Sequence, residues 1–227
     1  MTRSFAVSLP LEPAYLRNVL FVVELLDGVT LARVSQGLTV VAEGLHGRPI
    51  VNTGGLFVWL KEDIAPLRKI TIKPGVLPYE RLEIDAAEVE LPRTRRELSP
   101  RVDYPFAPGI TGLRGTVIET RVATPVAVPD AEVRFHWLDE DGVTWRDAPA
   151  VGRTGSRGDF AAILRLARTE VPQLDAGAVT VRVRVGRPGV NERVSGDLRL
   201  AQGRIADPST FPQGKDALIF AWDELQP

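Results

Sequence analysis

Short runs of β-branched and aromatic residues, each bounded by turn-forming residues, constrain the fold of this 227-residue chain more than any other feature. In the first part of the chain these runs are Phe21–Leu26, Leu38–Ala42, Leu56–Leu60, Ile70–Ile72 and Leu82–Ile84. The sequences between them are rich in glycine, proline, asparagine and aspartate, which are typical of tight turns. No long helical periodicity separates the runs, so the pattern predicts an all-β protein built as an antiparallel sandwich.

The second half of the chain repeats this pattern. In the run 131–138 the residues Val133, Phe135 and Trp137 alternate with polar ones, which predicts a strand with one buried face. A hairpin turn follows at 139–142, and later runs are 158–164, 179–185 and 217–222. Three side chains near the C-terminus are expected in the core: Leu218, Phe220 and Trp222.

A segment rich in proline and arginine, residues 92–111, divides the chain. Its prolines stiffen the backbone and remove donors from any β-ladder, which favours a connector over a strand. We therefore expect two tandem antiparallel β-sandwich domains, over residues 1–91 and 112–227, with an inter-domain linker at 92–111.

A glycine stands two residues before a phenylalanine at Gly55-Leu-Phe57 and again at Gly158-Asp-Phe160. Glycine reaches backbone conformations that other residues avoid, so it permits a tight turn at these positions. Both rings are expected to enter the core directly after the turn.

Three short motifs in the second domain are Gly115–Val117, Pro129–Phe135 and Thr154–Phe160. They follow the pattern G-x-V, P-x-A-x-V and T-x-x-x-G-x-F, and so resemble the carboxypeptidase regulatory-like (transthyretin-like) β-sandwich. The first domain shows a weaker version of the pattern, which includes Gly54–Val58. The second domain departs from it by an insertion that the 139–147 hairpin is expected to absorb.

That resemblance implies transthyretin- or Ig-like sandwiches that act as spacers, stabilisers or adhesive surfaces and not as enzymes. A pair of such modules also resembles accessory components of bacterial phage-tail-like contractile injection particles, near the tail cap or baseplate. It implies a non-enzymatic structural or adaptor protein whose partners are protein subunits of a larger assembly.

Composition excludes several classes of function. The chain has no cysteine and two histidines, so disulfides, thiolate catalysis and cysteine-ligated zinc are absent, and a histidine-rich metal site is hard to build. The 28 basic and 29 acidic residues give a formal net charge of −1, which argues against nucleic-acid binding by bulk charge. The most apolar run, Val19–Leu26, is too short to cross a bilayer, and the first ten residues lack a signal peptide's apolar core. We expect a cytoplasmic protein, without membrane insertion, that leaves the cell only within a released particle.

Each catalytic or metal-binding motif in the sequence has a simpler interpretation. Arg157-Gly-Asp159 fits the turn before Phe160, and the acidic segment 139–147 fits a hairpin because it lacks the ligand spacing of a calcium loop. Ser156 lacks the first glycine of a G-x-S-x-G motif, and Gly214-Lys lacks the rest of a phosphate-binding loop.

The two histidines do not form a site together in the sequence. His46 fits a loop, and His136 fits the outward face of its strand without a serine or cysteine motif to accompany it. The sequence therefore predicts no enzyme, no cofactor and no metal. A hydrolase with a carboxylate pair is left open, because nothing in one sequence selects such a pair.

Candidate partner contacts fall into two kinds. The segment 4–10 alternates, and it is expected either to add a strand to a neighbouring subunit's sheet or to be the first edge strand of the first domain. Its candidate partner-binding residues are Phe5, Val7 and Leu9. The other candidates are arginines of the linker and of the 179–185 run, namely Arg93, Arg95, Arg96, Arg182 and Arg184. These arginines fit either a solvated surface or contacts with an acidic partner or glycan.

The alternative function, from a different class, is a carbohydrate- or cell-surface-binding module. An exposed Trp59 or Trp145 would then stack on sugar rings. Trp59 alternates with Phe57 in the same run, which favours burial in the core and weighs against this alternative.

Overall fold

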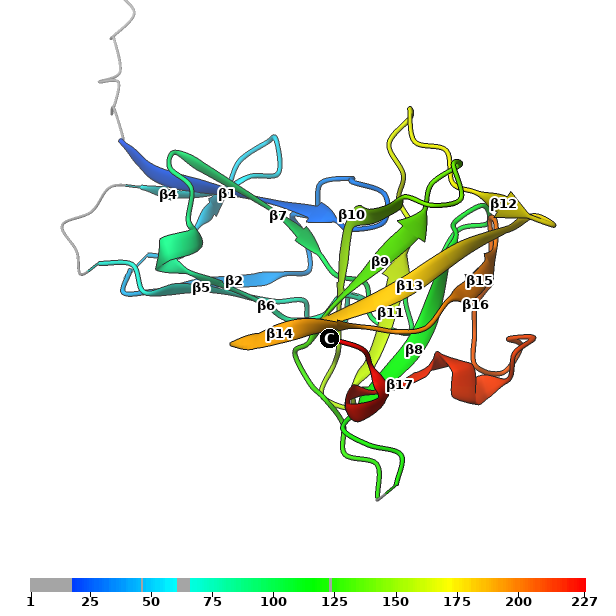
Figure 1. Ribbon diagram of the computed structural model, residues 1–227. Coiled ribbons are helices and arrows are strands. Elements are labelled where there is room, and N and C mark those ends of the chain that lie inside the picture. Colours follow the sequence, from blue (N-terminus) through cyan, green and yellow to red (C-terminus); the bar gives the residue numbers. More distant parts are fainter. Residues whose placement is uncertain (1–17, 46, 61–65, 123) are drawn as a thin grey trace, which may run out of the picture.

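The computed structural model describes residues 18–45, 47–60, 66–122 and 124–227, and its regular structure is almost entirely β (Figure 1). The exceptions among these residues are three 3-10 turns, η1 (Ala86–Glu88), η2 (Lys215–Leu218) and η3 (Trp222–Glu224). The prediction of an all-β protein is confirmed. Strands up to β7 lie on one side of Figure 1, and the strands from β8 onward lie on the other except β14, which extends beneath β6. We call these parts the N-terminal half (18–110) and the C-terminal half (111–227).

Two sheets make up the N-terminal half. One has the strand order β3-β4-β1-β7 and the other the order β2-β5-β6. In β1 the residues Phe21, Val23 and Leu25 point into the core, because alternate side chains of a strand face opposite ways. The strand bounds are β1 (Val19–Asp27), β2 (Thr39–Glu43), β3 (Ile50–Val51), β4 (Phe57–Leu60), β5 (Lys69–Lys73), β6 (Leu82–Asp85) and β7 (Arg93–Leu98).

The C-terminal half also has two sheets. One has the order β10-β9-β13-β12 with β14 and β15 paired to β13, and the other has the order β11-β8-β16 with β17 paired to β8. The strand bounds are β8 (Gly112–Ile118), β9 (Glu132–Leu138), β10 (Trp145–Arg153), β11 (Asp159–Ile163), β12 (Leu174–Asp175), β13 (Ala178–Arg187), β14 (Val190–Val194), β15 (Leu198–Ala201), β16 (Ile205–Ala206) and β17 (Ile219–Ala221). All seven side chains predicted for its core are buried: Val133, Phe135, Trp137, Phe160, Leu218, Phe220 and Trp222.

Each half has its own buried apolar cluster, and the two clusters meet at β10 and β11. Ala150 of β10 and Ile163 of β11 pack into the cluster of the N-terminal half. The Ser99 hydroxyl also donates to the Val151 carbonyl across the same junction, at 3.0 Å. The two halves are therefore in direct packed contact.

The prediction of purely antiparallel sheets is wrong for three strand pairs. β7 runs parallel to β1, and both β16 and β17 run parallel to β8. The strands of each pair are far apart in the sequence. A parallel partner requires such a long crossover, which patterns of neighbouring runs do not reveal.

Part of the segment expected to be a linker is a strand of the N-terminal half. Residues 93–98 form β7, and Leu98 and Tyr104 are buried in the N-terminal cluster. The Tyr104 hydroxyl donates to the carboxylate of buried Asp27 at 2.6 Å. The prediction that prolines keep this segment out of a ladder is wrong for 93–98, because Pro92 and Pro100 flank β7 instead of interrupting it.

The two predicted glycine turns are confirmed. Gly55 and Gly158 have φ values of 76° and 75°, and the phenylalanine two residues later is buried in each case. At Gly158 an added Cβ atom would lie 2.3 Å from the Val117 carbonyl oxygen, so only glycine fits there.

Candidate functional site

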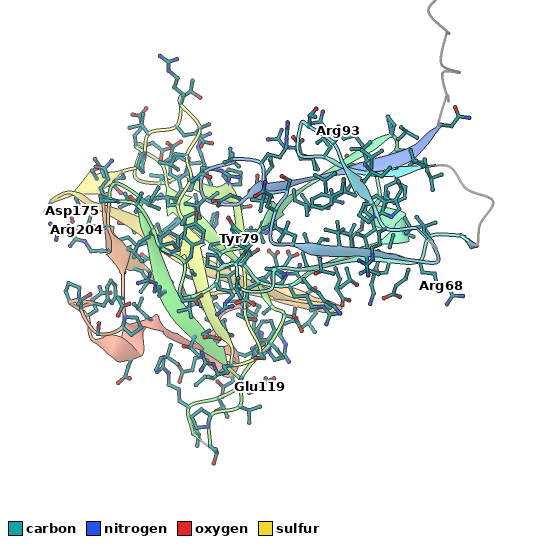
Figure 2. The ribbon with its side chains drawn as sticks, turned by 180° about the vertical axis from the view of Figure 1, so that it is seen from behind. Arg68, Tyr79, Arg93, Glu119, Asp175 and Arg204 are labelled. Carbon is teal, nitrogen blue, oxygen red and sulfur yellow. The ribbon has the colours of Figure 1, made fainter. Side chains whose placement is uncertain are left out.

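A buried glutamate beneath three arginines is the most unusual charged group in the N-terminal half. The Glu24 side chain is 3% exposed, and it lies on the face of β1 opposite the apolar core. Arg93 Nη2 lies 2.5 Å from Glu24 Oε2, Arg33 Nε lies 2.7 Å from Oε1, and Arg95 Nε lies 3.9 Å from Oε2. We call these four residues the Glu24 cluster; Figure 2 shows Arg93 on the outer side of this half.

The parallel pairing of β7 with β1 builds the Glu24 cluster. Val22 is level with Arg93, and Glu24 is level with Arg95, so both arginines lie on the outward face beside the carboxylate. Arg33 arrives from the loop after β1, where it forms a bridge with Leu26. Its guanidinium also donates to the Gly54 carbonyl, which fixes it in this position.

The Glu24 cluster has more positive than negative charge. Burial raises the pKa of Glu24, but hydrogen bonds from Arg93 and Arg33 outweigh it and hold the pKa below its usual value. The carboxylate is therefore ionised and supplies one negative charge against three positive ones. The side chains of Arg33, Arg93 and Arg95 are 42%, 51% and 61% exposed, so the excess of two positive charges lies at the surface.

A row of apolar side chains adjoins the Glu24 cluster on the same outward face. Ile50 is level with Val58, Val58 with Val22, and Val22 with Arg93. Residues opposite one another on paired strands share a face, and here Val22 and Val58 are partly buried while Ile50 is half exposed. The outer surface of this sheet is thus apolar on one side and cationic on the other.

Arg96 does not belong to the Glu24 cluster, although the sequence groups it with Arg93 and Arg95. Alternation along β7 turns it to the opposite face, where its guanidinium donates to the Glu88 carbonyl at 2.7 Å. It also lies 3.5 Å from the Glu90 carboxylate. The structure therefore separates the three predicted linker arginines into two groups.

The two arginines predicted on β13 are neutralised by carboxylates. Arg182 Nε lies 2.7 Å from Asp197, and Arg184 Nη1 lies 2.7 Å from Asp147. Arg184 also lies 3.3 Å from Glu192, so three carboxylates face two guanidinium groups. We call these five residues the β13 cluster. Its geometry corresponds to the solvated-surface interpretation.

One histidine and one tryptophan border the β13 cluster. The Arg182 guanidinium carbon lies 3.9 Å from the centre of the Trp145 ring, and the His136 ring lies 5.4 Å from it. Burial lowers the pKa of His136, and Asp147 opposes this effect without reversing it. His136 has the partly buried, outward position that its strand pattern predicts.

The remaining apolar, aromatic and histidine candidates fall into two groups. Phe5, Val7, Leu9 and His46 lie outside the described residues. Trp59 is buried and stacks on Phe21, with ring centres 4.7 Å apart, which confirms its predicted place in the core.

The two acidic motifs are turns, as the sequence predicts. The Asp141 carboxylate accepts hydrogen bonds from Val143 and Thr144 in the hairpin, and hydrogen bonds chiefly from Thr144 lower its pKa to about 2. Arg157 and Asp159 form an ion pair at 3.1 Å. Within the residues that the structure describes, no group of three or more potential ligands is placed to hold a metal ion.

A cleft between the two halves is the feature that the sequence analysis missed. It has a volume of about 790 Å³ and is lined from the N-terminal half by β6, η1 and β7, and from the C-terminal half by β10 and the β13–β14 hairpin. Figure 1 shows β14 reaching from the C-terminal half toward β6. The cleft is formed by strands that are far apart in the sequence, so no local sequence pattern predicts it.

Glu80 and Asp159 form an acidic pair at the junction of the halves, where both carboxylates lie beside Gly155. Figure 2 shows Tyr79, the neighbour of Glu80 in the sequence, near the middle of the molecule. Burial, followed by the nearby charge of Asp159, raises the pKa of Glu80 to about 7. Glu80 is thus the opposite of Glu24, because the charge of Arg101 lowers its pKa by less than burial and Asp159 raise it.

Comparisons with protein-family models, with curated proteins and with solved structures found no match to this chain. No helix among the described residues is both long enough and apolar enough to span a membrane. The interpretation of the site therefore depends on its chemistry.

Proposed function

We propose that this chain is a non-enzymatic structural or adaptor protein of a multiprotein assembly, built from two transthyretin-like β-sandwiches. Its docking surface is the outer face of β1 and β7, and the partner presents an acidic surface there. The single observation that carries the proposal is the charge excess of the Glu24 cluster, in which three exposed guanidinium groups surround one buried carboxylate.

The physical argument follows from what a protein partner would gain at this face. Arginine pairs with carboxylates through a planar, weakly hydrated group, and it is enriched at protein interfaces. Glu24 holds Arg93 and Arg33 in place, so a partner would lose less side-chain entropy by binding them. The adjoining Val22, Val58 and Ile50 offer apolar surface beside the charges.

The proposal includes a narrower assignment, which comes from the sequence resemblance. The assembly would be a phage-tail-like contractile injection particle, and the chain would be an accessory of its cap or baseplate. A glycan-binding function has less support, because Trp59 is buried and Arg182 covers the Trp145 ring.

Affinity capture of the tagged full-length protein from its native host, followed by mass spectrometry, tests the proposal. Arg95→Ala is the informative variant, because Arg95 is 3.9 Å from Glu24 and Arg93 and Arg33 still neutralise the carboxylate. The matched control is Arg199→Ala, which removes an exposed arginine paired with Asp175 in the C-terminal half.

The wild-type protein and the control should recover the same partner, and Arg95→Ala should recover less of it. Recovery should also fall as the salt concentration rises from about 0.15 to 0.5 M, because salt screens exposed charges. Recovery of sheath, tube or baseplate proteins would support the narrower assignment. Equal recovery by all three proteins would exclude this face as the docking surface, and a monomer without any partner would overturn the adaptor function.

A further inference from the structure

The cleft between the halves is bounded by strands that end their sheets. β7 is the last strand of the order β3-β4-β1-β7, β6 is the last strand of β2-β5-β6, and β10 is the last strand of β10-β9-β13-β12. All three contribute to the lining of the cleft. End strands carry backbone N–H and C=O groups without a partner strand, and such groups can pair with an added strand.

The free backbone groups of β7 are identified by its pairing with β1. Val22 N donates to Pro92 O, and Gly28 N donates to Leu98 O, each at 3.0 Å. In a parallel ladder every second residue bonds to the neighbour, so the even-numbered residues of β7 face β1. The backbone groups of Arg93, Arg95 and Glu97 therefore point away from β1. The Arg95 carbonyl accepts a hydrogen bond from the Arg96 guanidinium at 3.0 Å, which an added strand would have to displace, whereas the Arg95 and Glu97 N–H groups have no backbone partner among the described residues.

The edges of β6 and β7 meet at one end only. Glu80 N donates to Ser99 O, and Arg101 N donates to Pro78 O, each at 2.9 Å, around a bridge between Tyr79 and Pro100. Beyond this bridge the described strands β6 and β7 are not paired with each other, and both line the cleft. The bridge thus closes one end of a groove whose length β7 defines.

β7 is the edge best suited to an added strand. It has six residues, which corresponds to about 20 Å of extended chain. The β10 edge is less suitable, because its pairing with β9 is irregular between Asp147 and Val151 and because Ser99 occupies the Val151 carbonyl. The β6 edge has four residues and leads directly into η1.

The charge of the lining indicates the chemistry of the occupant. Seven acidic residues line the cleft: Glu83, Asp85, Glu88, Glu97, Asp130, Glu132 and Glu192. Four arginines line it as well, namely Arg95, Arg96, Arg153 and Arg187, and each lies within ion-pair distance of a carboxylate. Five of the seven acidic residues also pair with cations, whereas Asp85 and Asp130 form no ion pair among the described residues, so these two exposed carboxylates carry the unneutralised negative charge of the lining. Leu82, Val151 and Val190 provide apolar contacts, and no aromatic ring for stacking on a sugar is among the described lining residues.

We infer that the cleft binds an extended, lysine- or arginine-bearing segment of a partner protein, which pairs as an added strand with the free edge of β7. The inference rests on the proposed protein-binding function and gives the form of one contact. Arg95 of β7 belongs both to the lining of this cleft and to the Glu24 cluster, so the two surfaces adjoin at β7, and the partner presents basic residues to the cleft and acidic residues to the cluster.

Three peptides test the inference on the purified full-length chain. The first has about eight alternating lysine and valine residues, which cover the length of β7 at ~3.3 Å per residue. The second has the same sequence with N-methyl groups on alternate backbone nitrogens, and the third has glutamate in place of lysine. Binding is measured by fluorescence anisotropy at about 0.05 M salt, where screening is weak.

The lysine peptide should bind, and N-methylation should weaken its binding about tenfold or more, because two or three backbone hydrogen bonds are lost. The glutamate peptide should also bind at least about tenfold more weakly, through repulsion by the lining. Hydrogen exchange should slow at the amides of Arg95 and Glu97 when the lysine peptide is bound. Equal binding of the N-methylated peptide, or unchanged exchange at these amides, would overturn strand pairing.

A pair of variants tests the acidic lining without changing the core. Asp85→Asn with Asp130→Asn removes two exposed charges from the cleft, and asparagine tolerates the positive φ of 55° at position 130. Glu140→Gln with Asp223→Asn removes the same charge from exposed positions outside the lining. The first variant should bind the lysine peptide about threefold or more weakly than the second.

Equal binding by the two variants would overturn the assignment of the cleft as the binding site. If affinity capture recovers a partner through Arg95 but no peptide binds, the strand-pairing inference fails while the adaptor function stands. If the peptides bind as expected but capture recovers no partner, the adaptor function lacks support although the groove can accept a strand.

Discussion

The Glu24 cluster and the β13 cluster are both built from arginines and carboxylates, but their net charges are opposite. In the first, three arginines surround one carboxylate, and in the second, three carboxylates surround two arginines. The Glu24 carboxylate is buried, whereas the acids of the β13 cluster are substantially exposed. A group of arginines in a sequence therefore does not reveal the net charge of the surface that it forms, because this charge depends on which carboxylates the fold places beside the arginines.

The two clusters should also differ in what they contribute to stability. A buried carboxylate is costly unless it is paired, so the arginines around Glu24 are required by the fold itself. Exposed ion pairs such as those of the β13 cluster contribute little, because water and salt screen them. Variants of the two clusters should therefore differ in stability, most at Glu24 and least at Arg182.

Removing both close partners of Glu24 should give the largest loss of stability. In Arg33→Ala with Arg93→Ala, the buried carboxylate keeps only Arg95, at 3.9 Å. The two exposed arginines cover Glu24, so their removal also lets water reach the carboxylate, and we expect the free energy of unfolding to fall by about 2 kcal/mol, less than the cost of breaking a deeply buried ion pair. Urea denaturation monitored by circular dichroism measures this change.

Adding Glu24→Gln to the same double variant provides the control. The amide is uncharged, so the missing arginines no longer leave a buried ion without partners. The triple variant should regain about half or more of the lost free energy. A triple variant as unstable as the double variant would show that the arginines act by packing and not by neutralising Glu24.

The pH dependence of stability should distinguish Glu24 from Glu80, a partly buried carboxylate whose pKa is shifted in the opposite direction. Burial raises the pKa of Glu80 to about 7, so the folded state binds its proton more tightly than the unfolded state does. Its stabilising contribution is complete below about pH 4.5 and is lost as the pH rises through 7. Between pH 5 and 8 the wild type should lose about 1–2 kcal/mol relative to Glu80→Gln.

The control for this experiment is Glu140→Gln, which removes an exposed carboxylate of the C-terminal half. Its stability should follow the wild-type pH dependence. The comparison uses differences between variants, because His136 acts in the opposite direction: its lowered pKa makes the folded state less stable as the pH falls below about 6.5. Parallel curves for Glu80→Gln and the wild type would contradict the raised pKa.

The sequence predicts strands well wherever alternation is local. Val133, Phe135 and Trp137 lie on the buried face that their spacing indicates, and Phe57 and Phe160 enter the core after their glycines. In each case the deciding contacts are made by residues of one strand or one turn. This explains why the strand runs alone are enough to indicate the all-β class.

The sequence patterns do not predict strand β7 or the two sites that depend on it, the Glu24 cluster and the cleft. Only Thr94 and Leu98 in this strand are buried, and its arginines and flanking prolines are typical of a connector. Its pairing with β1 joins residues about 70 positions apart, a distance at which the chain itself gives no pattern. The Glu24 cluster and the cleft both depend on that pairing, so neither is predictable from the strand runs.

Removing an arginine from the β13 cluster should have a small effect on stability. In Arg184→Ala the neighbouring Asp147 and Glu192 are exposed enough to be solvated by water. We expect a loss of at most about 1 kcal/mol in the free energy of unfolding. A loss as large as that of the Arg33→Ala and Arg93→Ala double variant would remove the distinction between the two clusters.

The smallest effect on stability is expected at Arg182, where the change should appear in the environment of Trp145. The guanidinium of Arg182 covers one face of this ring at 3.9 Å, and Arg182→Ala exposes that face to water. Unfolding should change by about 0.5 kcal/mol, while the fluorescence of Trp145 shifts to longer wavelength and acrylamide quenches it more strongly. Because the other three tryptophans are buried, the shift is assigned to Trp145 by its loss in Trp145→Phe.

The Arg182→Ala variant also helps to decide between protein and glycan partners. If sugars bind to this variant and not to the wild type, the Arg182 side chain prevents sugars from stacking on the Trp145 ring. Quenching of the wild type by a glycan would instead place a binding site in the β13 cluster, and the functional contrast between the two arginine clusters would be wrong.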